Sequence, residues 1–316
     1  MAGRGARIPT AALWAVGSAF FWSLTAVIGR VQVRDGMPSS SALLTRFAVS
    51  AVLLVGATVV LRRPLAPARG ERLGVLALGF VGYGGESTLY FLGLERGSAA
   101  AVSLLFYTNP GIVMLLQWAF GHRKPQRSAL LAFGVALGGV VLVASTGSEV
   151  SITKAGALFA LAAATTYACY LLVSERVVAR SDPVTVAGWL SAGATVAMGV
   201  RCAFDGGVVI PADLRVQSLA AGIAAAVAFA LLLIALGKLG AGPTSMLLLL
   251  ELVCVIVLSA VFLDETLSPV QLIGGALIAL GALIIVRSGA TAGQAELVPE
   301  LVADGHVDDG GTGERG

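Results

Sequence analysis

The sequence predicts an all-α integral membrane protein with ten transmembrane helices, built as two inverted five-helix repeats with both termini in the cytoplasm. Its composition, a series of apolar runs and an internal repeat predict this fold. Of the 316 residues, 57% are hydrophobic and 12% are charged, and the mean hydropathy is +0.90. Soluble domains carry about 25% charged residues, so a water-soluble enzyme, a disordered chain and a nucleic-acid-binding protein are excluded.

Apolar runs of about 20 residues, the length that crosses the hydrocarbon core, recur along the chain between short polar breaks. The first run lacks a small-residue cleavage site and is followed by further runs, which favours a membrane span over a signal peptide. The predicted spans are 11–29, 40–61, 73–94, 99–120, 128–146, 155–174, 184–202, 217–237, 242–263 and 269–286. The span 73–94 is the least regular, because glycines and Glu86 interrupt it.

The distribution of basic residues predicts the orientation in the plasma membrane. Ten spans place both termini on one side. If that side is the cytoplasm, 14 of the 21 Lys and Arg residues lie inside, Arg46 lies within a span, and six lie outside: Arg30, Arg34, Arg96, Lys154, Arg201 and Arg215. This positive-inside bias favours cytoplasmic termini. Residues 1–10 are then a cytoplasmic N-terminal tail, and the acidic segment 288–316 is expected to be a disordered cytoplasmic tail.

The two halves of the chain, 11–146 and 155–287, resemble each other at an offset of about 145 residues. One face of the first span carries Trp14, Ser18, Trp22, Thr25 and Gly29, and the shifted positions are Phe159, Ala163, Tyr167, Tyr170 and Ser174. Because each half has five spans, the second half enters the membrane from the opposite side. Many secondary transporters use such inverted repeats for alternating access. Chance similarity between two apolar sequences is the alternative explanation.

The stretch 262–281, FLDETLSPVQLIGGALIALG, resembles the closing segment of EamA domains in the drug/metabolite transporter superfamily. The segment 99–110, with a proline in mid-span, resembles the fourth helix of the same domain. The resemblance covers residues 11–287 and implies a cavity formed by the first, third and fourth helices with the sixth, eighth and ninth. It also implies export of metabolites or amino acids. One departure is that Glu251-Leu252 replaces Asn109-Pro110 in the second copy, so a proline-dependent break is expected in one half only.

Two polar residues occupy the pseudo-symmetric centre of the predicted membrane region. Glu251 lies near the middle of span 242–263, and it aligns with Asn109 in span 99–120. Substrate and coupling-ion contacts are expected at this position. A carboxyl group in a low-dielectric site favours its protonated form, so Glu251 is the principal proton-coupling candidate. An interhelical hydrogen bond that holds the bundle together is the alternative interpretation.

Glu86 is the second candidate for substrate binding and proton coupling. It lies in the glycine-rich segment 82–90, one helical turn before Tyr90, so the two side chains share a helix face. The glycines allow close helix packing or local unwinding. A buried structural ion pair with Arg46 is an equally weighted alternative. For Arg46 itself, a structural position near the membrane interface is favoured.

The remaining substrate-binding candidates surround Pro110 or lie on the first and sixth spans. Pro110 removes a helical hydrogen bond and frees the carbonyl of Phe106. The candidates are Tyr107 and Thr108 beside it, and the aromatic residues Trp22, Tyr167 and Tyr170. Ordinary helix packing is the alternative for the aromatic residues.

These features predict a secondary transporter that exports a small organic metabolite across the plasma membrane by alternating access. Two membrane-embedded carboxyl groups with aromatic neighbours suit an amine or an amino acid, whereas a phosphorylated substrate would need more intramembrane basic residues. We expect no cofactor, metal site, catalytic residue or nucleic-acid partner, and the partners are a small molecule, the lipid bilayer and, if transport is coupled, protons. No feature indicates an oligomeric state. A non-transporting scaffold would have a dry centre, and an intramembrane enzyme would bring Glu86 and Glu251 into one hydrogen-bonded pair.

Overall fold

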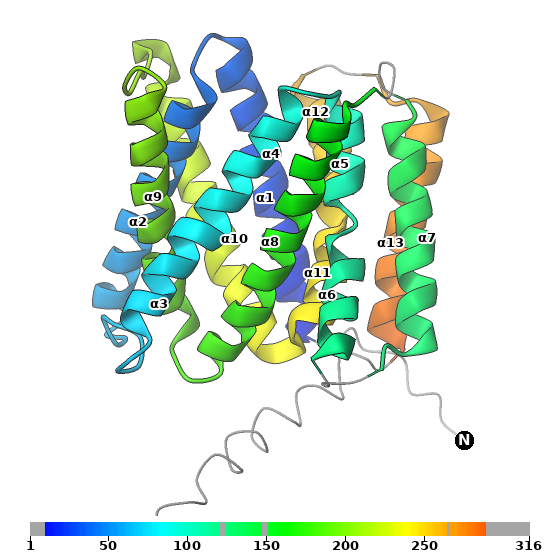
Figure 1. The fold of residues 1–316 in the computed structure, drawn as a ribbon, viewed down its shortest axis with the longest axis horizontal. Coiled ribbons are helices and arrows are strands. Elements are labelled where there is room, and N and C mark those ends of the chain that lie inside the picture. Colours follow the sequence, from blue (N-terminus) through cyan, green and yellow to red (C-terminus); the bar gives the residue numbers. More distant parts are fainter. Residues whose placement is uncertain (1–9, 121–123, 147–150, 264–265, 289–316) are drawn as a thin grey trace, which may run out of the picture.

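Ten helical spans run side by side in the computed structural model, which describes residues 10–120, 124–146, 151–263 and 266–288 (Figure 1). Each span is long and apolar enough to cross a membrane, so the ten predicted spans are confirmed. Within the described residues there is no strand, and Gly97 and Ile152 form an isolated bridge. The N-terminal tail before Thr10 and the acidic tail after Ser288 lie outside the described residues.

The first half contains α1 (Thr10–Arg34), α2 (Ser39–Val60), α3 (Arg72–Ala77), the π-helix η1 (Leu78–Gly85), α4 (Glu86–Leu94), α5 (Ala99–Phe106), α6 (Asn109–Ala119) and α7 (Arg127–Ala144). The second half contains α8 (Lys154–Val178), α9 (Pro183–Phe204), the short 3-10 helix η2 (Ala212–Leu214), α10 (Arg215–Leu239), α11 (Ala241–Leu248), α12 (Leu250–Phe262) and α13 (Pro269–Arg287).

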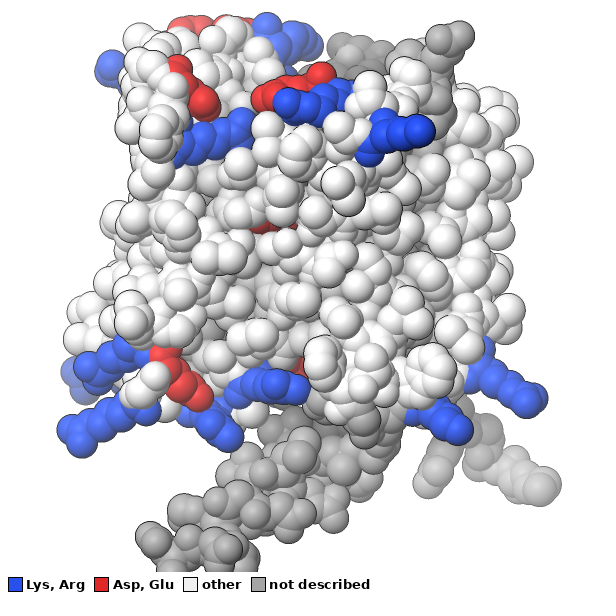
Figure 2. All heavy atoms as spheres, viewed as in Figure 1, with Lys and Arg blue, Asp and Glu red and all other residues white. Residues whose placement is uncertain are grey.

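Charged side chains gather at the two ends of the bundle. Figure 2 shows most of the visible Lys, Arg, Asp and Glu residues in two belts, with a broad band between them in which little charge is visible. Hydrocarbon cannot solvate charged groups, so this distribution is the one expected for a protein that spans a bilayer. Large apolar side chains on the outer surface of the band, such as Val52 (72% exposed) and Leu131 (61%), are then in contact with lipid.

The third span changes its helical geometry in the glycine-rich segment. Leu78–Gly85 forms a π-helix between α3 and α4. A side chain at Gly79 would overlap the carbonyl oxygen of Leu190 on α9, and one at Gly84 would overlap the Cβ of Ala197 on the same helix. The glycines therefore allow the backbone of the third span to pack directly against α9, as small residues do in other membrane helix pairs.

The fourth and ninth spans are both interrupted. The fourth breaks between α5 and α6, immediately before Pro110, and the ninth breaks at Leu249 between α11 and α12. The fourth span therefore has the break that was expected near Pro110. The ninth span breaks without a proline at that position, because Leu249 donates its N–H to the carbonyl of Met246 in a tighter turn.

The first helix of each half packs against the other half. The helix α1 contacts α10, α11 and α12, whereas α8 contacts η1, α4, α5 and α6. These contacts define two helix groups, one of α1 with α10, α11 and α12 and one of α8 with η1, α4, α5 and α6. The pairs α2–α9 and α7–α13 lie beside these two groups (Figure 1). Small residues permit the second pair: a side chain at Gly139 would overlap the carbonyl oxygen of Gly274.

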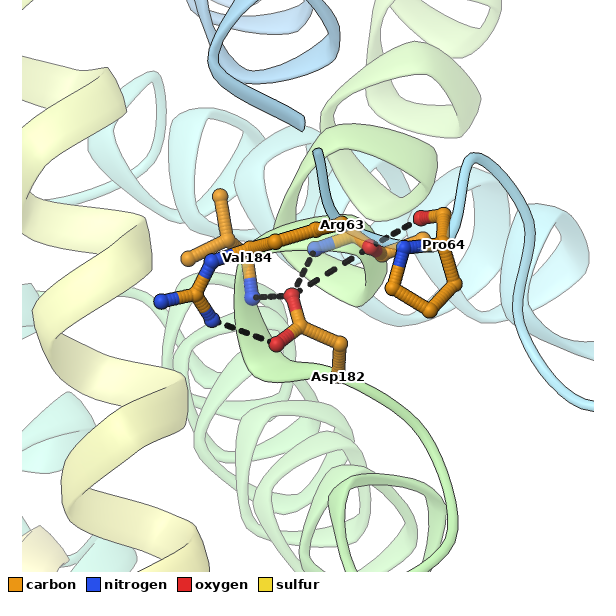
Figure 3. A network of polar contacts seen from close by, with 5 residues as sticks. Arg63, Pro64, Asp182 and Val184 are labelled. Carbon is orange, nitrogen blue, oxygen red and sulfur yellow. Dashed lines mark hydrogen bonds and ion pairs between the residues drawn. The ribbon is translucent and has the colours of Figure 1, made fainter. Parts of the chain in front are cut away.

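A polar network joins the halves at the end of the bundle where α1 begins and α2 ends (Figure 3). Asp182 accepts hydrogen bonds from the backbone N–H groups of Val184 and Thr185, both at 3.1 Å, and so caps the N-terminus of α9. Its other carboxylate oxygen lies 2.5 Å from the Arg63 guanidinium. The Thr185 hydroxyl donates to the carbonyl of Pro64. The segment after α2 is therefore held against α9.

Candidate functional site

A cavity of about 500 Å³ lies between the helix group containing α1 and the group containing α8. It reaches the end of the bundle where α1 ends, because Val33, Ser39 and Leu94 belong to its wall. Of the described residues of α1, none before Trp22 lines the cavity, and on the third span none before Tyr83 does. On these two spans the cavity wall therefore ends near mid-helix, at Trp22 and Tyr83.

The structure brings seven of the nine predicted substrate-binding residues to the cavity wall. They are Trp22, Glu86, Tyr90, Tyr107, Asn109, Tyr167 and Glu251. The other two, Thr108 and Tyr170, are not lining residues. Tyr170 is fully buried behind the wall, where its ring packs against Tyr83 at a centroid distance of 5.5 Å.

The side chains of Thr108 and Asn109 satisfy backbone groups at the break in the fourth span. The Thr108 hydroxyl donates to the carbonyl of Leu105 at 2.6 Å, and the Asn109 amide donates to the carbonyl of Phe106 at 2.9 Å. Pro110 has no N–H for the Phe106 carbonyl, so Asn109 replaces the missing donor. Asn109 remains a wall residue with its amide nitrogen already bonded.

Aromatic side chains form the closed end of the cavity. The rings of Trp22 and Tyr83 stack at a centroid distance of 5.7 Å, and both contact Phe229, at 4.9 and 5.0 Å. Phe47 packs edge-on against Tyr83 at 5.2 Å. Phe47 and Phe229 are fully buried, so this cluster separates the cavity from the end of the bundle that holds the Arg63–Asp182 network.

The two carboxyl groups face the cavity from different helix groups. Glu86 on α4 is 7% exposed and accepts a hydrogen bond from the Ser87 hydroxyl at 3.1 Å. Glu251 on α12 is half-buried. Within the described part of the chain the two carboxyl groups do not hydrogen-bond to each other, nor does either form an ion pair. The hydrogen-bonded pair expected of an intramembrane enzyme is therefore not present.

Two arginines on the wall are not among the predicted substrate-binding residues. The sequence favours a structural position for Arg46 and an outer segment for Arg30, yet both line the cavity with Glu86 and Glu251. Arg30 donates to the Ser259 hydroxyl at 3.3 Å. A sequence signal existed for Arg46, because an arginine inside an apolar span seldom lacks a partner or a function. For Arg30 the sequence signal is its spacing: Trp22, Ala26 and Arg30 follow one another at four-residue intervals and so share one face of α1.

The wall combines opposite charges with aromatic and hydroxyl groups. Two arginines and two glutamates line it, together with Tyr90, whose hydroxyl lies 2.8 Å from that of Ser103. The described residues contain no group of three His, Cys, Asp or Glu side chains that could hold a metal ion. Such a wall can hold a small molecule that carries both charges and an apolar body.

Comparisons with known proteins identify transporters as relatives of this chain. The sequence profile of the EamA-like transporter family matches residues 9–145 and 154–287. The chain is 29% identical over 262 residues to the threonine/homoserine exporter RhtA of Escherichia coli (strain K12), covering 81% of this chain and 82% of that protein. It is 30% identical over 193 residues to the uncharacterized transporter YwfM of Bacillus subtilis (strain 168), covering 60% and 65%. A protein crystal structure with 19% sequence identity superposes with a TM-score of 0.74, over 93% of this chain and 99% of that chain, and shows the same fold.

Proposed function

The chain belongs to the EamA-like transporter family, and we propose that it is a secondary exporter of a small amino acid or amine. It is a multi-pass plasma-membrane protein whose relatives are transporters. The observation that carries the substrate class is the cavity wall, which holds two carboxyl and two guanidinium groups among aromatic rings. The relative RhtA is a threonine/homoserine exporter, which supports an amino acid as substrate.

The proposed mechanism is alternating access by two inverted five-helix repeats, 11–146 and 155–287. The helix contacts support this symmetry. In such a repeat α1 corresponds to α8, and α10 corresponds to the third span, which includes η1 and α4. The contact between α1 and α10 is then equivalent to the contact of α8 with η1 and α4. The pairs α2–α9 and α7–α13 then consist of equivalent helices. The two groups either side of the cavity would rock against each other about the central site.

The proposed orientation has both termini in the cytoplasm, as the basic residues favour. The cavity then opens to the outside. The aromatic cluster of Trp22, Tyr83 and Phe229 and the network between Arg63 and Asp182 (Figure 3) would close the cytoplasmic side. This conformation corresponds to the outward-facing state, from which an exporter releases its substrate.

Proton coupling is proposed through Glu251, with Glu86 as the second group. Both carboxyl groups lie on the cavity wall, where they meet substrate and solvent in the outward-facing state. They come from the two helix groups that move in the proposed mechanism. A carboxyl group that reaches the cavity without an ion pair can exchange a proton with solvent, so proton uptake and substrate release can be linked at this site.

Transport by the purified protein in proteoliposomes tests the proposal. We expect uptake of labelled L-threonine or L-homoserine that unlabelled amino acid inhibits, stimulation by a pH gradient, and no uptake in protein-free vesicles. Absence of transport for every amino acid and amine in a panel, in a protein that melts cooperatively, would contradict the proposed function.

A further inference from the structure

Arg46 lies on the cavity wall with a guanidinium group that has no hydrogen bond or ion pair to any described residue. Its Nε is buried without a partner. The Cζ atom lies 4.9 Å from the ring centroid of Phe47 and 5.8 Å from that of Trp22. Aromatic rings thus support the flat side of the guanidinium, while its N–H groups have no acceptor among the described residues.

This arrangement differs from that of a structural arginine in the same protein. Arg201 on α9 also lies over an aromatic ring, 5.4 Å from the centroid of Phe91. Its Nη1 is also buried without a hydrogen-bond partner, but its Nε forms an ion pair with Asp205 at 3.4 Å, and Arg201 does not line the cavity. A buried guanidinium without an acceptor is costly in a low-dielectric site, and the free position beside Arg46 is the cavity itself.

We infer that Arg46 binds the carboxylate of an amino acid substrate, and that Glu86 and Glu251 receive its ammonium group. This inference rests on the proposed function and deepens it, because it makes the substrate a zwitterion and excludes a simple amine. A guanidinium presents a planar pair of donors that matches a carboxylate. A carboxylate in the cavity would give the Arg46 N–H groups the acceptor that no described residue provides.

The positions of the three groups suit a zwitterion that bridges the moving parts. Arg46 belongs to α2, Glu86 to α4 and Glu251 to α12, and all three line one cavity. A ligand with an ammonium and a carboxylate group on one carbon atom can neutralise Arg46 and one carboxyl group together, which a cation or an anion alone cannot do.

The test compares two ligands that differ only in the carboxylate. L-Threonine carries both charges, whereas L-threoninol keeps the ammonium and replaces the carboxylate by a hydroxymethyl group. Dissociation constants are measured on the purified full-length protein for the wild type, Arg46→Gln, Arg46→Lys and the matched control Arg201→Gln. Melting temperatures without ligand report whether each variant is folded.

We expect the wild type to bind L-threonine at least about tenfold more tightly than L-threoninol, the usual size of a charge-assisted contact. Arg46→Gln should remove this preference by weakening L-threonine binding alone, and Arg201→Gln should keep it. Equal weakening of both ligands, or no change, would overturn the inference. If Arg46→Gln does not fold, Arg46→Lys decides, because a point charge should lower the preference several-fold, and an unchanged preference would overturn the inference.

The outcomes separate this inference from the proposed function. A wild-type protein that transports L-threoninol as well as L-threonine would overturn the role of Arg46 and leave the transporter intact. A folded wild-type protein that binds and transports neither ligand, nor any other amine or amino acid, would overturn both.

Discussion

The side-chain amide of Asn109 replaces the backbone donor that Pro110 cannot supply, at 2.9 Å from its Nδ2 to the carbonyl oxygen of Phe106. A membrane helix can break without leaving an unsatisfied carbonyl only if a neighbouring group takes over the bond. Asn109 does so from the adjacent position in the chain. The break between α5 and α6 is therefore stabilised locally, beside the cavity wall.

This relationship predicts a specific rescue. Asn109→Leu should lower the stability by about 1 kcal/mol, the net value of one hydrogen bond, because the Phe106 carbonyl loses its donor. Adding Pro110→Ala should restore most of the loss, since alanine supplies the missing backbone N–H. Thermal unfolding of the single and double variants in detergent, with Pro110→Ala alone as the control, measures both effects. If Asn109→Leu lowered the free energy of unfolding equally with proline and with alanine at position 110, the Asn109 amide would have another role.

A second prediction concerns proton coupling. Glu251→Gln keeps the size of the side chain but cannot take up or release a proton. We expect substrate exchange to continue in proteoliposomes while the stimulation by a pH gradient is lost. Glu95→Gln is the matched control, because Glu95 is an exposed residue paired with Arg96 outside the cavity. If a pH gradient still stimulated transport by the Glu251→Gln variant, Glu251 would be excluded as the coupling group.

The glycines of the third span give a third prediction. Gly79→Ala should destabilise the protein by about 1–3 kcal/mol, because the new Cβ would meet the carbonyl oxygen of Leu190. Gly85→Ala, in the same π-helix, meets nothing within 4 Å and should be neutral or stabilising. Melting temperatures of the two variants test this difference. Similar melting temperatures would mean that the third span and α9 are less closely packed than described.

The orientation gives a fourth prediction, tested by labelling in intact cells. The native cysteines Cys169, Cys202 and Cys254 are first replaced by serine or alanine. A cysteine at Val33, a cavity residue that is 47% exposed, should then react with a membrane-impermeant maleimide added outside. A cysteine at Arg69, an exposed position at the opposite end, should react only after the cells are opened. The reverse pattern would place both termini outside.

Much of the fold could be predicted from the sequence because a bilayer imposes strong rules. A span needs about 20 apolar residues, and the predicted runs agree with the helices within a few residues, including the irregular third span, Arg72–Leu94. The break at Leu249 could not be predicted. No proline marks it, and it depends on Leu249 donating its N–H to the carbonyl three residues earlier, that of Met246, and not to the carbonyl four residues earlier.

A position on the cavity wall could be predicted where a polar or aromatic residue stands out against an apolar span, as Glu86, Glu251 and Trp22 do. The position of Thr108 off the wall could not, because a hydroxyl can bond to its own helix, which the sequence does not reveal. Arg46 was given a structural position because its depth in the span was known but its neighbours were not. Only the fold shows that Phe47 and Trp22 hold its guanidinium at the cavity.

The exchange of first helices between the halves has a consequence for biosynthesis. The ribosome releases α1 before any other span, yet its main partners, α10, α11 and α12, begin only at Arg215. The third and fourth spans in turn lack α8 until the second half is made. Neither half has its full set of neighbours alone, so the early spans must remain in the bilayer, unassembled, until the late ones are inserted. A gene split after α7 should give two fragments that are degraded singly and stable when produced together.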